Sequence, residues 1–168
     1  MTNVTRKSVL MRAFLALAVT CAVLAPTAPA AAQQLPFTPP KGWTQQEPPA
    51  GFLGLWVKPA GDNSYAQTIN VYGHSFDGSL SDFYAFSIRA LKKRFPGGDV
   101  AVSQDTTVCG GRAAKYISYA VNTNAGPMIV EQIMTVSKGN AYFVTYIRLA
   151  GQESDANARH SMTTICGI

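Results

Sequence analysis

The stretch MIVEQIMTVSKGNAYFVTYIRL, residues 128–149, decides the fold. Its centre, Lys138-Gly139-Asn140, is a strong turn signal between two apolar runs. In the second run, successive side chains divide between two faces, as they do in a β-strand. One face holds Tyr142, Val144, Tyr146 and Arg148, and the other holds Phe143, Thr145, Ile147 and Leu149. We therefore expect an antiparallel hairpin of residues 128–136 and 141–149.

Further strands are predicted on the N-terminal side of this hairpin. The apolar run Phe52–Val57 and the alternating segment Gln67–His74 indicate two strands joined by a turn. Valines within residues 100–108 indicate another strand, which ends at the turn Gly110-Gly111. The segment Ala113–Val121 follows it as the next strand. The sheet is thus expected to be antiparallel.

Two helices complete the pattern. Ser79, with Asp82 three residues later, resembles a capping box, and apolar residues follow at helical spacing until Pro96. They are Leu80, Phe83, Tyr84, Ile88, Leu91 and Phe95. Near the C-terminus, Ser154 or Asp155 can cap a short helix. Its apolar stripe is Ala158, Met162 and Ile165.

Residues 1–32 have the order of a secretory signal peptide. A positive region precedes an apolar stretch, residues 13–25, which is too short to span about 30 Å of hydrocarbon as a helix. The basic residues are Arg6, Lys7 and Arg12. Ala30-Ala31-Ala32 then offers the small residues that a signal peptidase needs. We expect cleavage near Gln33 and a periplasmic or secreted protein without a transmembrane segment. The alternatives are an uncleaved anchor or a lipoprotein modified at Cys21.

The remaining chain is predicted to hold one domain. Residues 33–50 are rich in Pro and Gln and indicate an extended lead-in rather than a strand or helix, which leaves residues 51–168 as a single α+β domain. The whole chain has a formal net charge of +5, but three of its 14 basic residues and none of its acidic residues lie in residues 1–32. A net charge of only +2 then remains, which does not indicate binding to nucleic acid.

The cysteines predict one cross-link. After removal of Cys21, Cys109 and Cys166 form a pair without a leftover thiol, as expected of a disulfide in an oxidising compartment. In the chain-entropy model such a bond stabilises the fold by roughly 4 kcal/mol. The alternative is two unrelated buried thiols. Because CxxC and paired histidine motifs are absent, the sequence predicts neither a metal site nor a cofactor.

The sequence contains no recognisable catalytic motif. Its two histidines are His74 and His160, and we expect both to be exposed. His74 precedes Ser75 and Asp77, but neighbours on a strand point to alternate faces and cannot form a catalytic relay by themselves. We therefore assign no catalytic residue.

Two groups of residues are candidates for binding. The basic cluster Arg89, Lys92, Lys93 and Arg94 can dock an acidic partner or lipid headgroups, or can simply be a solvated helix end. Five tyrosines on predicted strands can either fill the core or line a ligand cleft. They are Tyr72, Tyr116, Tyr119, Tyr142 and Tyr146.

The order of these elements resembles the PsbP-like fold. Local features are similar too: PKGW at residues 40–43, VCGGRAA at 108–114 and AYFVTY at 141–146. The resemblance implies an α+β fold in which helices flank an antiparallel sheet, an α/β/α sandwich. The family shares no single reaction, and most members look like binding or assembly proteins.

These observations lead to one expected function and two alternatives. We expect an exported, non-catalytic protein that binds a partner protein or a component of the cell envelope. The first alternative is a small periplasmic hydrolase with an unrecognised site near His74. The second is a carrier of a small apolar ligand held between helix and sheet.

Overall fold

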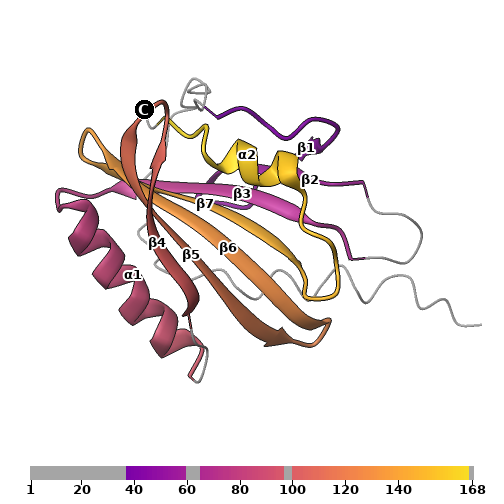
Figure 1. The fold of residues 1–168 in the computed structure, drawn as a ribbon. Coiled ribbons are helices and arrows are strands. Elements are labelled where there is room, and N and C mark those ends of the chain that lie inside the picture. Colours follow the sequence, from indigo (N-terminus) through magenta and orange to yellow (C-terminus); the bar gives the residue numbers. More distant parts are fainter. Residues whose placement is uncertain (1–36, 60–64, 97–99, 167–168) are drawn as a thin grey trace, which may run out of the picture. The chain divides into compact units, whose positions relative to one another are not determined.

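The computed structural model describes residues 37–59, 65–96 and 100–166. In this part of the chain, seven strands form one antiparallel sheet in the order β1-β2-β3-β7-β6-β5-β4 (Figure 1). The strands are β1 (Thr44–Gln46), β2 (Phe52–Val57), β3 (Thr68–Ser75), β4 (Val100–Val108), β5 (Arg112–Thr123), β6 (Gly126–Ser137) and β7 (Asn140–Leu149). The helices are α1 (Leu80–Arg94) and α2 (Ala156–Met162). The predicted α+β class with an antiparallel sheet is thus confirmed, whereas the predicted signal peptide lies outside the described residues.

The predicted hairpin is present as β6 and β7, and it lies in the interior of the sheet. Ser137 pairs with Asn140, so the turn between them has two residues. Both turn residues, Lys138 and Gly139, have positive φ values, of 49° and 74°. This backbone matches the right-handed twist of the two strands and favours a glycine in the turn.

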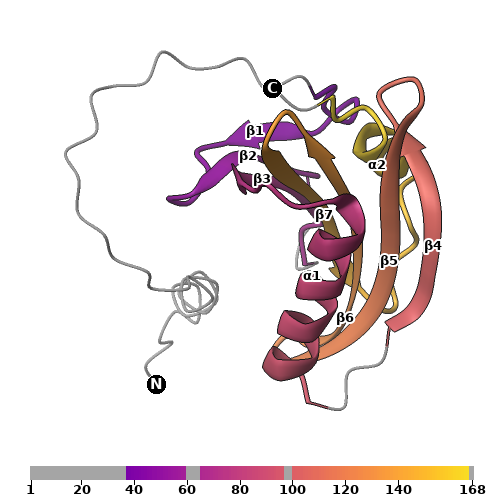
Figure 2. The same cartoon turned by 90° about the vertical axis from the view of Figure 1, so that its left-hand side faces the viewer.

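The two faces of the sheet bury separate hydrophobic cores. α1 packs on one face, where Phe83 is wholly buried with Met134 of β6 and Ala141 of β7. α2 packs on the other face, where Met162 lies in one core with Tyr146 of β7. Figure 2 shows the two helices in the turned view. The alternation predicted for β7 therefore separates the two cores.

Helix α1 begins as the sequence predicts. The Ser79 hydroxyl accepts a hydrogen bond from the backbone N–H of Asp82, and the Asp82 carboxylate accepts one from the backbone N–H of Ser79. This reciprocal capping box satisfies two N–H groups that have no partner within the helix. The helix ends before Phe95, and Pro96 follows. Among the described residues, neither helix has the length and apolar character needed to cross a bilayer.

Two segments differ from the prediction. Thr44–Gln46 pairs with β2 as the edge strand β1, although the sequence indicated only an extended lead-in. All three of its residues are exposed, so they carry no hydrophobic signal of a strand. At the other end, α2 stops at Met162, yet Ile165 beyond it is still wholly buried in the core beside Met162.

Candidate binding site

The end of α2 is tied to the turn after β4. Cys109 and Cys166 form a disulfide with their Cα atoms 4.8 Å apart. The Cys109 backbone N–H also donates a hydrogen bond to the Thr163 carbonyl over 3.0 Å. Cys109 itself has a φ of 50°, because the chain turns sharply here before Gly110-Gly111. These links hold the end of α2 at a fixed position above β4 and β5.

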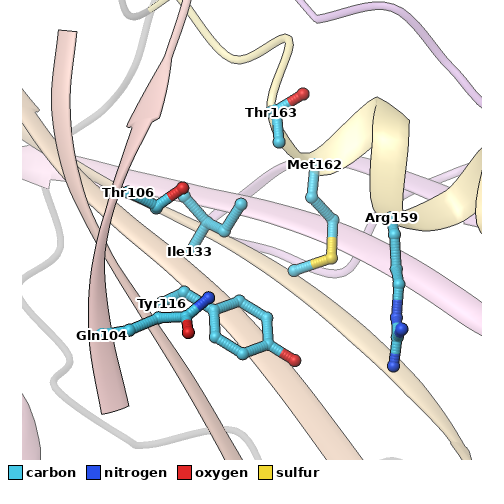
Figure 3. Close-up of a pocket in the computed structure, with 7 residues that line it drawn as sticks. All are labelled: Gln104, Thr106, Tyr116, Ile133, Arg159, Met162 and Thr163. Carbon is cyan, nitrogen blue, oxygen red and sulfur yellow. The ribbon is translucent and has the colours of Figure 1, made fainter. Parts of the chain in front are cut away.

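A hollow of about 280 Å³ lies beside this junction, between α2 and the adjacent face of β4, β5 and β6 (Figure 3). It is lined by Gln104, Thr106, Tyr116, Ile133, Arg159, Met162 and Thr163. Figure 3 shows the Met162 side chain extending from α2 toward the strands that carry Ile133 and Tyr116. These three form an apolar floor, while Gln104 and Thr106 of β4 form a polar wall. The hollow therefore places a few polar groups around an apolar floor that is itself largely buried, since Ile133 and Met162 are 3 % and 1 % exposed.

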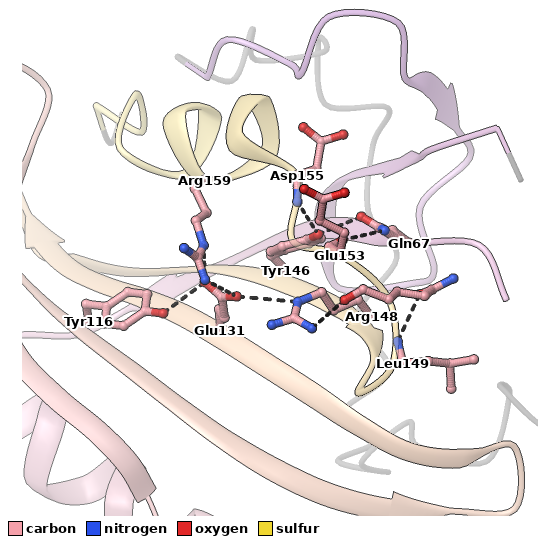
Figure 4. Close-up of polar contacts among 10 residues, drawn as sticks. Gln67, Tyr116, Glu131, Tyr146, Arg148, Leu149, Glu153, Asp155 and Arg159 are labelled. Carbon is pink, nitrogen blue, oxygen red and sulfur yellow. Dashed lines mark hydrogen bonds and ion pairs between the residues drawn. The ribbon is translucent and has the colours of Figure 1, made fainter.

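A buried carboxylate adjoins the hollow. Glu131 of β6 is only 1 % exposed, and Arg159 of α2 donates to it from Nε and Nη2 over 3.0 and 3.1 Å (Figure 4). The Tyr116 hydroxyl donates to the same carboxylate over 2.8 Å, and Arg148 lies 3.7 Å from it. A buried charge is costly unless it is paired and hydrogen-bonded, and these three partners meet that requirement.

The network raises the pKa of two of its members, Tyr116 and Arg159. Burial, together with the hydrogen bond to Glu131, raises the pKa of Tyr116 to about 12. The hydrogen bond to Glu131 also raises the pKa of Arg159. The Tyr116 hydroxyl therefore keeps its proton near neutral pH and acts as a donor. The arrangement holds the Tyr116 and Arg159 side chains in place against Glu131.

A second polar network anchors the beginning of α2. The Tyr146 hydroxyl donates to Gln67 over 2.6 Å and accepts from the Asp155 backbone N–H over 3.0 Å. The Asp155 carboxylate caps α2 and pairs with Lys58 over 2.8 Å. Burial raises the pKa of Asp155, but hydrogen bonds from Lys58 and from the helix N–H groups lower it more, so the net shift is downward. Both ends of α2 are thus fixed to the sheet.

The sequence analysis did not identify the Glu131–Arg159 pair. The sequence predicts that His160 is exposed, and it is. Arg159, its neighbour, instead reaches across to the sheet. The available signal was Glu131, a single charge within the otherwise apolar or neutral run MIVEQIMTV. Such a residue on a strand buried on both faces requires a basic partner elsewhere in the chain.

The predicted basic cluster lies on the opposite side of the sheet, on α1. Arg89, Lys92, Lys93 and Arg94 are all exposed, and none of them forms an ion pair with an acid in the part of the chain that the structure describes. Phe86, one turn earlier, is 55 % exposed. Because helix positions three and four apart share a face, Phe86, Arg89 and Lys93 form one outward stripe.

His74 is less exposed than we expected, because aromatic rings surround it. The rings of Tyr72, Phe76 and Phe83 have their centroids 5.5, 6.3 and 5.6 Å from that of His74. Its Nδ1 atom is buried and has no hydrogen-bond partner among the described residues. Burial lowers the pKa of His74. Packing, rather than a relay with Ser75 or Asp77, accounts for this environment.

The five tyrosines divide between core and surface. Tyr119, Tyr142 and Tyr146 are buried, as core residues are. Tyr116 lines the hollow beside α2, and Tyr72 is only partly buried. Phe83 fills the space between α1 and the sheet. The hollow lies between α2 and the sheet, so the alternative of an apolar ligand held between helix and sheet concerns the α2 side.

Comparisons with known proteins relate the chain to solved structures. No protein-family model matches it, and no curated protein matches its sequence. LpqN of Mycobacterium tuberculosis, involved in cell envelope biogenesis, is similar with a TM-score of 0.57 and 18 % identity, over 76 % of this chain and 78 % of LpqN. PA94 of Pseudomonas aeruginosa, a protein of unknown function, is similar with a TM-score of 0.51 and 14 % identity, over 70 % of this chain and 87 % of PA94. The chain shares the fold of LpqN.

The PsbP of the cyanobacterium Synechocystis is also among the similar structures. Its TM-score is 0.49 and its identity 11 %, over 68 % of this chain and 74 % of that protein. A PsbP is thus among the structures to which this chain is similar, as the sequence resemblance predicts. At such low identities a shared fold does not transfer an activity.

Proposed function

We propose that this protein is an exported, non-catalytic binding protein of the cell envelope, which docks on anionic lipid headgroups through the C-terminal half of α1. The observation that carries the proposal is the outward stripe of Phe86, Arg89 and Lys93, extended by Lys92 and Arg94. A helix surface that combines basic side chains with an exposed aromatic ring suits the boundary between headgroups and acyl chains.

The expected strength of this docking is modest. Each Lys or Arg close to an anionic surface contributes about 1 kcal/mol, so four such residues contribute about 4 kcal/mol. That free energy corresponds to roughly millimolar binding, to which the insertion of Phe86 adds. The protein would therefore bind the membrane surface reversibly, and binding would weaken as salt screens the charges.

Other features support an envelope role. A disulfide such as Cys109–Cys166 persists in exported proteins, in agreement with the signal peptide that the sequence predicts. LpqN, which has the same fold, is involved in cell envelope biogenesis. One helix against each face of the sheet supports the three-layer α/β/α arrangement implied by the sequence resemblance.

Vesicle co-sedimentation tests the proposal. We expect the exported protein to bind vesicles that contain phosphatidylglycerol and not vesicles of phosphatidylcholine alone, and added salt should release it. Lys92→Gln/Lys93→Gln should weaken binding several-fold. Lys41→Gln/Lys138→Gln is the matched control, because it removes the same charge from two exposed lysines outside α1 and should leave binding unchanged.

Two results would contradict docking on lipids. If the wild-type protein stays in the supernatant with anionic vesicles at low salt, the basic end of α1 serves another partner, such as an acidic protein. If both double variants lose binding equally, the total charge of the protein and not this surface is responsible.

A further inference from the structure

Strand β4 forms a long free edge of the sheet. It has nine residues and lies at the end of the strand order, paired on one side only, with β5. Residues 101–105 are all exposed, and Val102 is 43 % exposed. The opposite edge, β1, has three residues. In the described part of the chain, no turn or loop donates a hydrogen bond to the outer side of β4.

Beyond a register shift against β5 between Val100 and Val102, this edge has little of the usual protection against pairing. Natural edge strands are commonly short or carry lysine or proline, which blocks the approach of another strand. The sequence of β4, VAVSQDTTV, contains neither. Its single charge, Asp105, is paired with Lys115 of β5. The backbone N–H and C=O groups along the outer side are therefore available to an incoming strand.

The hollow beside α2 opens next to this edge. Its near wall consists of Gln104 and Thr106, which are β4 residues that point to the same face as Tyr116 of β5. A strand added to β4 would lie about 4.8 Å away and would direct alternate side chains to that face. A long side chain on it would reach across Gln104 and Thr106 toward Tyr116 and Met162.

We propose that β4 binds an extended peptide segment of a partner protein as an additional strand, and that a long apolar side chain of the peptide enters the hollow. Backbone hydrogen bonds to β4 would supply most of the affinity. The hollow would select the side chain, which is the usual division of roles when a peptide extends a sheet. This surface lies on the α2 side of the sheet and is separate from the basic end of α1.

A second copy of this chain fits the same edge less well. Two-fold antiparallel pairing of β4 with β4 keeps equivalent faces of the two sheets on the same side. The side chains brought next to each hollow would then be Val102, Gln104 and Thr106 of the other copy, which are short or polar. They would add little apolar contact to the hollow, whose deepest residues, Ile133 and Met162, are 3 % and 1 % exposed. A leucine, methionine or phenylalanine in a different sequence would cover it.

The hollow is a preformed site. The disulfide and the hydrogen bond from Cys109 to Thr163 fix its end beside β4. The pair of Arg159 and Glu131 fixes its opposite wall on α2. Binding therefore needs no ordering of the receptor, and only the peptide loses conformational freedom.

Selection from a library of displayed random peptides as long as β4 tests the proposal. We expect the enriched sequences to alternate polar and apolar residues, and to carry Leu, Met or Phe at one recurring position. A synthetic peptide of the enriched sequence should slow amide exchange in β4 and not in α1. Two versions of this peptide can be N-methylated at complementary sets of alternate amides. Their affinities should differ, because only one set of amides faces β4. One version should lose binding about tenfold or more and the other should retain it.

Adjacent threonines offer a matched pair of variants. Thr106 lines the hollow, whereas Thr107 is exposed on the opposite face of β4. Thr106→Trp should fill the hollow and weaken peptide binding about tenfold or more, while Thr107→Trp should leave it nearly unchanged. Both variants should bind anionic vesicles like the wild type, so a failure here is distinguishable from a failure of the lipid proposal.

Three results would overturn the proposal. Selection could enrich no sequence above the unselected library. The enriched peptide could protect a surface other than β4, or respond equally to the two threonine variants. Finally, sedimentation could show a dimer that Thr106→Trp leaves intact, with the β4 amides protected from exchange in the absence of peptide. That result would assign the edge to a second copy of the chain.

Discussion

Arg159 on α2 donates two hydrogen bonds, from Nε and Nη2, to the buried carboxylate of Glu131 on β6. The two residues are 28 positions apart in sequence. This contact holds the middle of α2 against the sheet, between the disulfide at one end of the helix and the Asp155–Lys58 pair at the other. A helix of seven residues has little stability of its own, so these tertiary contacts keep it folded.

Removal of the Arg159 side chain should destabilise the protein. Arg159→Ala leaves the buried carboxylate with Tyr116 and the more distant Arg148 as partners, and a lost hydrogen bond to a charged group costs about 1.5–3 kcal/mol. Urea denaturation measures the change. Arg89→Ala is the control, because this exposed arginine should change stability by no more than about 0.5 kcal/mol. Equal stability of the two variants would show that the carboxylate does not depend on Arg159.

Loss of the disulfide should have a larger effect. Cys109 and Cys166 are 57 positions apart, and closing a loop of that length is worth about 4 kcal/mol in the chain-entropy model. Cys109→Ser/Cys166→Ser should therefore unfold at a much lower urea concentration, and reductant should have no further effect on it. Thiol titration of the denatured exported protein should detect no free thiol. Detection of two would show that the cross-link is absent.

Much of the fold follows from local sequence patterns. The two-residue turn at Lys138-Gly139, the alternation along β7 and the capping box at Ser79 are each formed by residues close together in the chain. Short-range sterics and hydrophobic periodicity decide such features, so they could be predicted.

The candidate site could not be predicted in the same way. The hollow depends on where α2 lies over β4, β5 and β6, and its lining comes from segments up to 59 positions apart, Gln104 to Thr163. The partner of Glu131 is likewise set by tertiary structure. Strand β1 was not predicted for another reason, because an exposed edge strand of three polar residues has no apolar pattern. Of the residues that line the hollow, the sequence analysis singled out only Tyr116 and Met162, and it did not place them together.

A pair of phenylalanines on α1 tests the orientation of that helix. Phe83 is wholly buried between α1 and the sheet, whereas Phe86 is mostly exposed. Phe83→Ala should lower the free energy of unfolding by about 3–5 kcal/mol, because it leaves a cavity in the core. Phe86→Ala should change it by less than about 0.5 kcal/mol. Similar losses in both variants would mean that α1 is rotated from the position described.

His74 should make stability depend on pH. Burial among aromatic rings lowers the pKa of folded His74 below its ordinary value of 6.5, so the unfolded chain takes up this proton more readily. The resulting contribution to stability is present above about pH 6.5 and is lost as pH falls through 6.5 toward the lower pKa of the folded state. His74→Phe should reduce the loss of stability between about pH 8 and about pH 5.

The matched control for this pH profile is His160→Gln, a change at an exposed position of α2. Urea midpoints at the two pH values provide the comparison. A His74→Phe protein that loses as much stability on acidification as the wild type would show that other groups cause the pH dependence.

The bond between Cys109 and Cys166 makes β5, β6, β7 and α2 part of one covalent ring, and leaves β1, β2, β3, α1 and β4 on an open tail. A protease that cuts once within residues 110–165 would therefore yield two pieces that still migrate together until a reducing agent is added. A single cut in the tail would give two pieces that separate in denaturing electrophoresis without a reducing agent. Proteolysis followed by electrophoresis with and without reductant would thus show which half of the molecule opens first under stress.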